Sequence, residues 1–341
     1  MKEAFHILIT ATNAVLPIVL LILLGYWLRQ TGFFSGEFVK TGNKLVFNVC
    51  LPCMLFVNVY DIEGFGSISW DIVIYSVLMV FVIFLLGLTI CLLTTKEPKR
   101  RGSICQAVFR SNMAIIGLSL ASELGGNDAV AAAAIVSAFT VPVFNILAVF
   151  ALTMFCSEDS KGKVDFKKIF INIAKNPLII SIALGMVCLV IRGIQTSLFG
   201  EPVFMLKDIQ FLYKALSNLK SIASPFALLV LGGQFTFSAV KALWKEIVCG
   251  TLGRIILAPL VGIGTAVVLS SLGILSCGVS EYPALIALFG SPTAVSSAVM
   301  AGQMGADEQL ATQLVVWTSI GSIFTVFGTV CILMAMGLLA V

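Results

Sequence analysis

The residues best suited to bind a solute interrupt a long apolar stretch near the C-terminal end, at Gly290-Ser291-Pro292-Thr293. Pro292 has no N–H to donate, and it moves the preceding residue out of the helical region. We therefore predict a break at Gly290–Ser291, followed by a new helix with Ser291 as N-cap and Pro292 as first residue. Such a helix start would offer unpaired N–H groups and the positive end of its dipole to an anion. The alternative is one proline-kinked helix whose serines bond back to its own carbonyls.

A second polar interruption, Arg110-Ser111-Asn112, lies in an apolar stretch of the first half. A buried amide needs partners, because leaving it unpaired costs roughly 2 kcal/mol or more. Asn112 would either bond to a neighbouring helix or bind the solute beside Ser291, and we favour the solute. Arg110 and Arg254 are charges that fall inside apolar stretches, where charged residues are functional candidates by default. Each would brace the broken helices through backbone carbonyls, which we favour, or compensate the charge of a bound carboxylate. Arg110 has the further alternative of extending its side chain to the membrane surface, since Arg101 lies nine residues away.

Other polar residues inside apolar stretches are candidates for shaping the same pocket. We predict this role for Asn48, Asn145 and Ser296, whereas Thr293 is expected to bind the carboxylate together with Ser291 and Pro292 at the new helix end. Asn48 would either face the cavity or pack between helices.

Composition places these residues in a membrane. The 341 residues are 59% hydrophobic and 11% charged, and the mean hydropathy is +1.07. A bilayer core is spanned by about 20 apolar residues, and the sequence offers ten such stretches. They are Ile7–Leu28, Leu45–Tyr60, Ile72–Leu93, Ile104–Leu120, Ala129–Phe155, Pro177–Ile194, Ile209–Phe235, Ile247–Leu272, Ala284–Gly302 and Leu310–Leu339. We predict an all-α integral membrane protein with ten transmembrane helices.

Basic residues predict the orientation, because cytoplasmic loops carry an excess of lysine and arginine. Most of the 21 basic residues fall in alternate connections, such as Lys96–Arg101 and Lys161–Lys175. Placing these inside puts both termini outside the cell membrane. The basic loops are expected to face lipid headgroups, so no nucleic-acid partner is predicted.

The two halves of the chain carry similar features in the same order. Pro17, Gly25 and Arg29 match Pro177, Gly185 and Arg192, and the polar interruptions fall in the fourth and ninth spans. Five spans per half give the halves opposite orientations. We predict a first repeat at 1–155, a cytoplasmic linker at 156–175 and a second, inverted repeat at 176–341. Interrupted segments at matching positions of inverted halves indicate the binding site of a transporter.

Residue types argue against catalysis and metal chemistry. His6 is the only histidine, and the 17 acidic residues fall in connections or near helix ends. We predict no enzyme activity, no cofactor and no metal site. Because ion pumps commonly keep a carboxylate inside the membrane, an anionic solute suits this sequence better than a cation.

Several motifs together resemble the auxin efflux carrier family, which includes plant auxin exporters and bacterial permeases for malate or malonate. The similar segments are NKLVFNVCLPCMLF (43–56), RSNMAIIGLSL (110–120), PFALLVLGGQF (225–235), RIILAPL (254–260) and FGSPTAVSSAVMAGQMGAD (289–307). The resemblance implies inverted five-helix repeats, a scaffold that is often dimeric, and a mobile domain whose fourth and ninth helices cross at their breaks. It also implies carboxylate binding near the crossing, with Asn112 as a contact.

The sequence departs from the family at one point. Many relatives carry proline two residues after the fourth-span glycine, where this chain has Ser119 after Gly117 and Leu118. The first break is therefore expected to depend on Gly117 and on Ser119 bonding back to the helix, with Gly290 allowing the second.

The sequence as a whole predicts a secondary transporter of small organic anions, such as malate, malonate or auxin-like acids. It would work by elevator-type alternating access, with membrane lipids and a second copy of the chain as partners. The alternative is a sodium-coupled symporter with the architecture of the bile-acid carriers.

Overall fold

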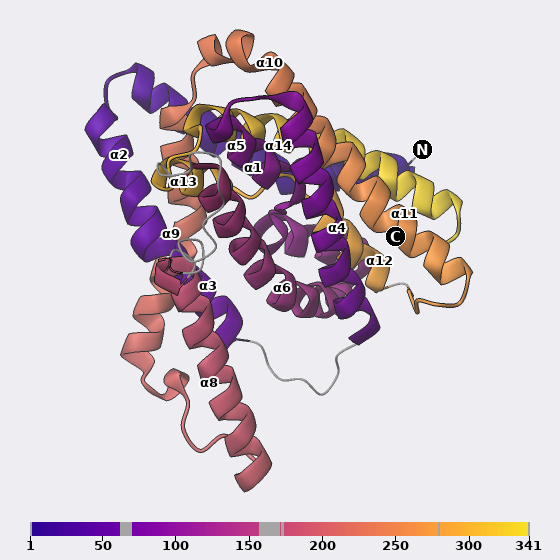
Figure 1. Ribbon diagram of the computed structural model, residues 1–341. Coiled ribbons are helices and arrows are strands. Elements are labelled where there is room, and N and C mark those ends of the chain that lie inside the picture. Colours follow the sequence, from indigo (N-terminus) through magenta and orange to yellow (C-terminus); the bar gives the residue numbers. More distant parts are fainter. Residues whose placement is uncertain (1, 62–69, 157–170, 172–173, 279, 340–341) are drawn as a thin grey trace.

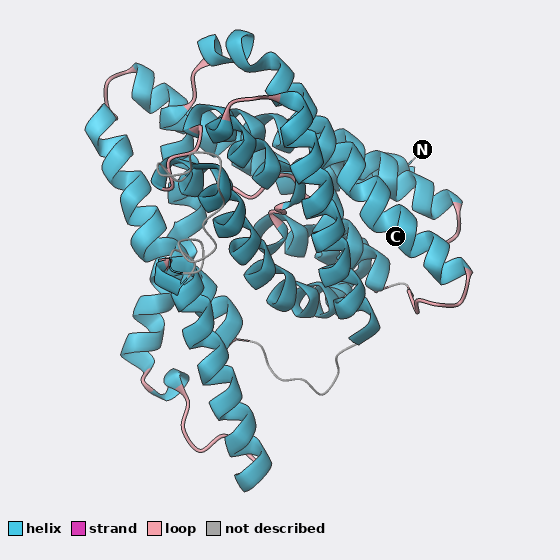
Figure 2. Cartoon of the chain, in the orientation of Figure 1, coloured by secondary structure: helices cyan, strands magenta, loops and turns pink. Residues whose placement is uncertain are grey.

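The computed structural model describes residues 2–61, 70–156, 171, 174–278 and 280–339 (Figure 1). Figure 2 shows helices joined by short loops. The first half contains α1 (Lys2–Gln30), α2 (Gly36–Leu45), η1 (Val46–Cys50), α3 (Leu51–Tyr60), α4 (Trp70–Thr94), α5 (Pro98–Phe109), η2 (Met113–Gly117) and α6 (Leu118–Cys156). The second half contains α8 (Pro177–Phe199), η3 (Leu206–Asp208), α9 (Gln210–Gln234), α10 (Phe237–Leu252), η4 (Gly253–Leu257), α11 (Ala258–Ser271), α12 (Glu281–Leu285), η5 (Ile286–Gly290), α13 (Ser296–Gln303) and α14 (Glu308–Ala335).

The described residues confirm an all-helical chain with several apolar helices. Seven are long and apolar enough to cross a bilayer: Gly36–Tyr60, Trp70–Thr94, Leu118–Cys156, Pro177–Phe199, Gln210–Gln234, Phe237–Ser271 and Glu308–Ala335. The other three predicted spans fall on the Leu16–Gln30 part of α1 and on the interrupted segments around α5 and α13. Ten crossings and the inverted repeat remain predictions. Most of the predicted linker at 156–175 lies outside the described residues.

Short π-helical turns interrupt four of the apolar segments. Pro52 follows η1 and Pro259 follows η4, each near the start of the next helix. A proline cannot donate the usual backbone hydrogen bond, so a wider turn before it leaves the remaining bonds intact. The other two π-helical turns, η2 and η5, lie directly beside the two breaks.

The two breaks pair with each other. The chain leaves α5 at Arg110 and resumes at Met113, and it leaves η5 at Ser291. The Asn112 N–H donates to the Pro292 carbonyl over 2.9 Å, and the Ala294 N–H donates to the Arg110 carbonyl over 3.1 Å. These bonds form an isolated antiparallel bridge between Ser111 and Thr293. Because broken backbone inside a membrane must find partners within the protein, the pairing explains how both helices stop there.

One detail of the predicted breaks is wrong. The second helix starts at Ser296, not at Pro292, because the antiparallel bridge holds Pro292 and its neighbours extended. The first break falls at residues 110–112, where the sequence places the polar interruption, and Gly117 follows it as the last residue of η2.

Gly117 has a different structural task, which is to let η2 cross η5. A Cβ atom on this residue would lie 2.7 Å from the backbone carbonyl oxygen of Ala287, which cannot move aside as a side chain would. Glycine is therefore required at the crossing.

We expect Gly117→Val to lower the apparent melting temperature of the purified protein in detergent. Overpacking at a fixed backbone contact typically costs about 1–3 kcal/mol. Gly264→Val in α11 is the matched control, because a Cβ there meets no atom within 4 Å. Equal melting temperatures for the two variants would contradict the close crossing.

The helices form two groups. In the α9 group, α1 and α2 pack on α9, while α3 packs on both α8 and α9. Gly25 lies against the Leu229 carbonyl and Gly232 against the Ile22 carbonyl, so α1 and α9 approach closely. The α5 group contains α4, α5, α6 and α10 to α14, packed around the two breaks. Figure 1 shows α2, α3 and α8 on one side of the molecule and α4, α11 and α12 on the other.

Candidate functional site

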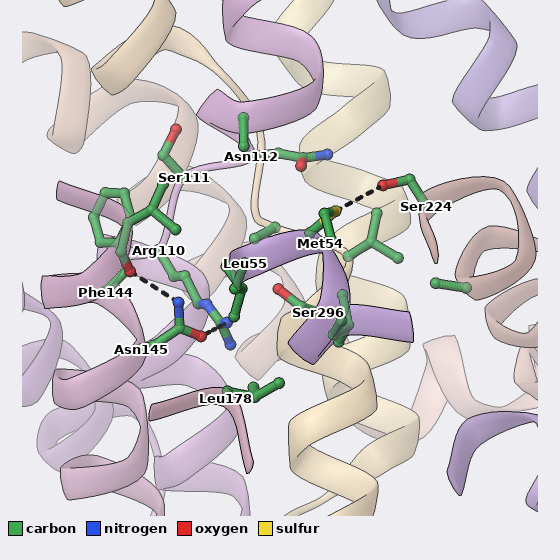
Figure 3. Close-up of a pocket in the computed structure, with 16 residues that line it drawn as sticks. Met54, Leu55, Arg110, Ser111, Asn112, Phe144, Asn145, Leu178, Ser224 and Ser296 are labelled. Atoms are coloured by element: carbon green, nitrogen blue, oxygen red, sulfur yellow. Dashed lines mark hydrogen bonds between the residues drawn. The ribbon is translucent and has the colours of Figure 1, made fainter. Parts of the chain in front are cut away.

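A small cavity of about 40 Å³ lies where the α9 group faces the two breaks (Figure 3). Its lining comes from α3, α9 and the start of α8 on one side, and from α6 and both breaks on the other. The lining residues are Leu51, Met54, Leu55, Arg110, Ser111, Asn112, Ala114, Val141, Phe144, Asn145, Leu178, Ser224, Ala227, Ala294, Val295 and Ser296. The volume suits a carboxylate-sized group.

Arg110 brings a positive charge to this cavity. It is only 3% exposed, so it does not reach the membrane surface. Its guanidinium donates to Asn145 Oδ1 at 2.7 Å, to Gln106 Oε1 at 3.1 Å and to Met300 Sδ at 2.7 Å. Figure 3 shows the Arg110 guanidinium beside the Asn145 amide. Among the described residues, no carboxylate pairs with it.

Several hydrogen-bond donors around Arg110 are buried and have no protein partner. Asn112 is 4% exposed, and its Nδ2 makes no hydrogen bond. The Ser111 hydroxyl and Gln106 Nε2 are in the same situation. An unsatisfied buried group costs about 1–3 kcal/mol. The cavity thus combines an unpaired cation with donors that lack acceptors, which favours a negatively charged or strongly hydrogen-bond-accepting ligand.

Arg254 lies behind the breaks, outside the lining of the cavity. It is 1% exposed and donates to five backbone carbonyls, those of Val108, Phe109, Leu288, Phe289 and Ser291, at 2.8–3.3 Å. These carbonyls belong to the C-terminal ends of α5 and η5, where the helix dipoles are negative. Of the two roles considered for Arg254, the geometry matches bracing of the broken helices.

The residues of the second break hold the crossing together. The Ser291 hydroxyl donates to the Ala287 carbonyl at 2.6 Å, and the Thr293 hydroxyl donates to the Ala107 carbonyl at 2.8 Å. Ser291, Pro292 and Thr293 do not line the cavity. Gly290 makes only ordinary contacts, so its lack of a side chain is not what breaks the helix.

Asn145 and Ser296 do line the cavity, whereas Asn48 and Ser119 do not. Asn48 is exposed, and its amide donates to the Lys44 carbonyl at 2.9 Å. In an unbroken α-helix it would share a face with Leu51 and Leu55, but the π-helical turn η1 rotates it away. Ser119 is exposed on the first turn of α6.

Some residues in or beside the cavity were not predicted. Gln106 orients Arg110 from one helical turn earlier, and the spacing of four residues is a signal that was available in the sequence. Ser224 and Met54 face each other across α9 and α3, with a hydroxyl-to-sulfur distance of 3.8 Å. Their contact depends on how α3 packs against α9, and the sequence pattern does not predict this packing.

A larger cavity of about 410 Å³, which we call the vestibule, adjoins the central one. The two share Leu55, Ala114 and Val141, so they lie on either side of one ring of side chains. The vestibule is mostly apolar, with alanines of α6 along one wall, and its polar lining residues are Asn58, Asp61, Ser137 and Lys220.

Positive charge collects at the rim of the vestibule, around Asp61. Lys207 and Lys220 each lie 3.3 Å from its carboxylate, and the Tyr213 hydroxyl donates to it at 2.8 Å. Desolvation opposes charge on Lys207, but its hydrogen bond to Asp61 and the nearby negative charge leave its pKa above the ordinary value. Lys207 therefore stays protonated at neutral pH, and two cations face one anion.

Two helices broken side by side around a buried cavity, within a set of apolar helices, define the architecture of a membrane transporter. The sequence comparison agrees. The chain belongs to the membrane transport protein family, whose model matches residues 10–330, and this confirms the resemblance to the auxin efflux carrier family.

Similar proteins are themselves described as transporters. An uncharacterized transporter of Methanothermobacter thermautotrophicus is 22% identical over 319 residues, covering 92% of this chain and 95% of that protein. The uncharacterized transporter YfdV of Escherichia coli K12 is 25% identical over 255 residues, covering 72% of this chain and 74% of that protein. Both likenesses support membrane transport and leave the solute open.

Proposed function

We propose that the protein is a secondary transporter of small organic anions, with the carboxylate bound in the central cavity. The observation that carries this proposal is Arg110, which is buried at the first break and bonded only to neutral groups. A buried charge without a counter-charge is unfavourable, and a bound carboxylate would supply that charge. Asn112 Nδ2 and the Ser111 hydroxyl would complete its coordination.

The sizes of the two cavities support a ligand with a small carboxylate group and a larger apolar part. The central cavity of about 40 Å³ accepts the carboxylate. The apolar vestibule of about 410 Å³ would hold the rest of the molecule, past the ring of Leu55, Ala114 and Val141. A carboxylic acid with an apolar body fits this arrangement better than a compact dicarboxylate. The net positive rim around Asp61 would draw anions towards the opening.

Transport would follow from movement between the two helix groups. The central cavity has walls from both groups, and the vestibule opens it towards the Asp61 end. In the orientation that the basic loops favour, this end is outside. Sliding of the α5 group along the α9 group would carry the breaks and the bound anion to the other side, as in an elevator.

Ligand-dependent stabilisation tests the proposal. We expect aliphatic and aromatic monocarboxylates to raise the melting temperature of the purified protein, because a ligand at 100 times its Kd stabilises by about 2.7 kcal/mol. The uncharged carboxamides of the same acids should have no effect. Asn112→Ala should weaken carboxylate binding about tenfold or more, since hydrogen bonds to charged groups contribute about 1.5–3 kcal/mol.

The opposite pattern would refute an anion site. Stabilisation by carboxamides or by cationic solutes, with none from any carboxylate, would show that the cavity does not select negative charge.

A further inference from the structure

A carboxylate joins the two helix groups at the end of the molecule opposite the vestibule. Glu308 is the first residue of α14, in the α5 group. Its Oε1 accepts hydrogen bonds from Asn43 Nδ2 at 2.8 Å and from Gln234 Nε2 at 2.7 Å. Asn43 is on α2 and Gln234 ends α9, so both donors come from the α9 group. These bonds cross the interface along which the groups would slide.

The amide of Asn43 has an acceptor to spare. Asn43 is 3% exposed, and its Oδ1 is buried with no hydrogen-bond partner, although its Nδ2 is bonded to Glu308. An ionised carboxylate only accepts hydrogen bonds, whereas a protonated one also donates. The ionised form of Glu308 thus accepts hydrogen bonds from two amide donors. The unused buried acceptor, Oδ1, belongs to Asn43, which is one of these two amides. Asn43 and Gln234 can therefore supply hydrogen-bond partners for both the ionised and the protonated carboxyl group of Glu308.

Packing holds the carboxylate at the interface. Gly302 of α13 faces Glu308 so closely that a Cβ atom on it would collide with Oε1. Glu308, Asn43 and Gln234 border a cavity of about 460 Å³ between α1, α2, α9, α13 and the start of α14.

The charged neighbours of Glu308 are few. Arg29 from α1 and Lys40 and Lys44 from α2 line the same cavity, and all three are exposed. Asp307 instead caps α14 at Leu310 and lies 3.5 Å from Arg100. Within the described part of the chain, no lysine or arginine forms an ion pair with Glu308. Because three cationic side chains line the cavity beside this one carboxylate, a metal cation is a poor ligand for Glu308. The cation that remains as a ligand is the proton.

We propose that Glu308 is a proton-binding site that couples one proton to each anion carried, an inference that rests on the anion transport proposed above. A proton from the water on one side binds a carboxylate oxygen and returns to water on the other side. Protonation replaces the two charge-assisted bonds from Asn43 and Gln234 with neutral ones and adds a neutral bond from the new O–H to Asn43 Oδ1. Because charge-assisted bonds are roughly twice as strong as neutral ones, the contact between the groups loosens. A monoanion and its proton then cross together without net charge.

Infrared spectroscopy tests the proton site without requiring transport. We expect the purified protein to show a carbonyl-stretching band of a carboxylic acid that appears as the pH is lowered. One component of this band should be missing in Glu308→Gln, whose amide keeps the side-chain shape and the contact with Asn43. It should remain in Glu246→Gln, which removes a carboxylate paired with Arg100 at 2.8 Å inside the α5 group. An unchanged band in Glu308→Gln would overturn the assignment.

Proteoliposomes test the coupling. With an inward proton gradient, the wild type should accumulate a labelled carboxylate at least tenfold above protein-free vesicles, which report passive entry of the neutral acid. Glu308→Gln should still exchange labelled for unlabelled carboxylate, yet should lose this gradient-driven accumulation. Accumulation by Glu308→Gln at the wild-type level, or accumulation driven only by a sodium gradient, would overturn proton coupling. Absence of any carboxylate exchange in the wild type would refute the transport function, and the infrared result alone would then decide the proton site.

Discussion

Replacing Arg110 with glutamine should lower carboxylate affinity by about 10- to 100-fold. Glutamine keeps polarity at the first break but removes the charge, and hydrogen bonds to charged groups contribute about 1.5–3 kcal/mol. At 25 °C each 1.4 kcal/mol corresponds to a tenfold change in Kd. Titration of the purified variant with a labelled monocarboxylate measures the effect. The uncharged carboxamide of the same acid should show no measurable binding to either protein, because it gains nothing from the charge.

The matched control lies on the same helix. Arg101→Gln removes a guanidinium that bonds the Thr95 carbonyl at the polar end of α5, nine residues from Arg110. This variant should bind the carboxylate like the wild type. If Arg110→Gln binds carboxylates as tightly as Arg101→Gln, the charge at the break has no part in recognition.

Replacing Arg254 with methionine should destabilise the fold by about 3 kcal/mol or more, because each buried carbonyl that loses its donor costs about 1–3 kcal/mol. Methionine fills a similar volume but leaves the five carbonyls at the ends of α5 and η5 without their donors. Arg254→Lys should recover only part of this loss, because one ammonium group cannot reproduce the planar fork that reaches both helices. Thermal unfolding in detergent measures both variants.

Lys241→Met is the control for a loss of charge near Arg254 in the sequence, since Lys241 is exposed on α10. It should unfold at the wild-type temperature. A wild-type melting temperature for Arg254→Met would show that the broken helices hold together without the brace.

The sequence predicted the places where structure is interrupted better than it predicted the geometry there. Proline and the polar residues located both breaks, because they cannot be accommodated in an unbroken apolar helix. The position of the new helix start was missed by several residues. Its cause is the antiparallel bridge between Ser111 and Thr293, a contact between segments far apart in the chain.

The direction in which side chains point was the second feature that the sequence did not predict fully. Asn112 and Asn145 lie at the cavity, where they were predicted, and Arg110 lies there as well. Asn48 points away because of a π-helical turn that residue spacing does not reveal. The role of Glu308 was also not visible. It looks like a helix-end acid in the sequence, and only packing brings Asn43 and Gln234 to it from 265 and 74 residues away.

Counterflow in proteoliposomes tests the central claim most directly, because it needs no ion gradient and no net charge movement. Vesicles loaded with an unlabelled monocarboxylate should transiently accumulate the labelled acid from outside. Excess external carboxylate should abolish this accumulation, the carboxamide of the same acid should not, and Arg110→Gln vesicles should show little accumulation. Equal competition by the acid and its amide, or full counterflow in the Arg110 variant, would contradict an anion carrier whose site lies at the crossing of the two broken helices.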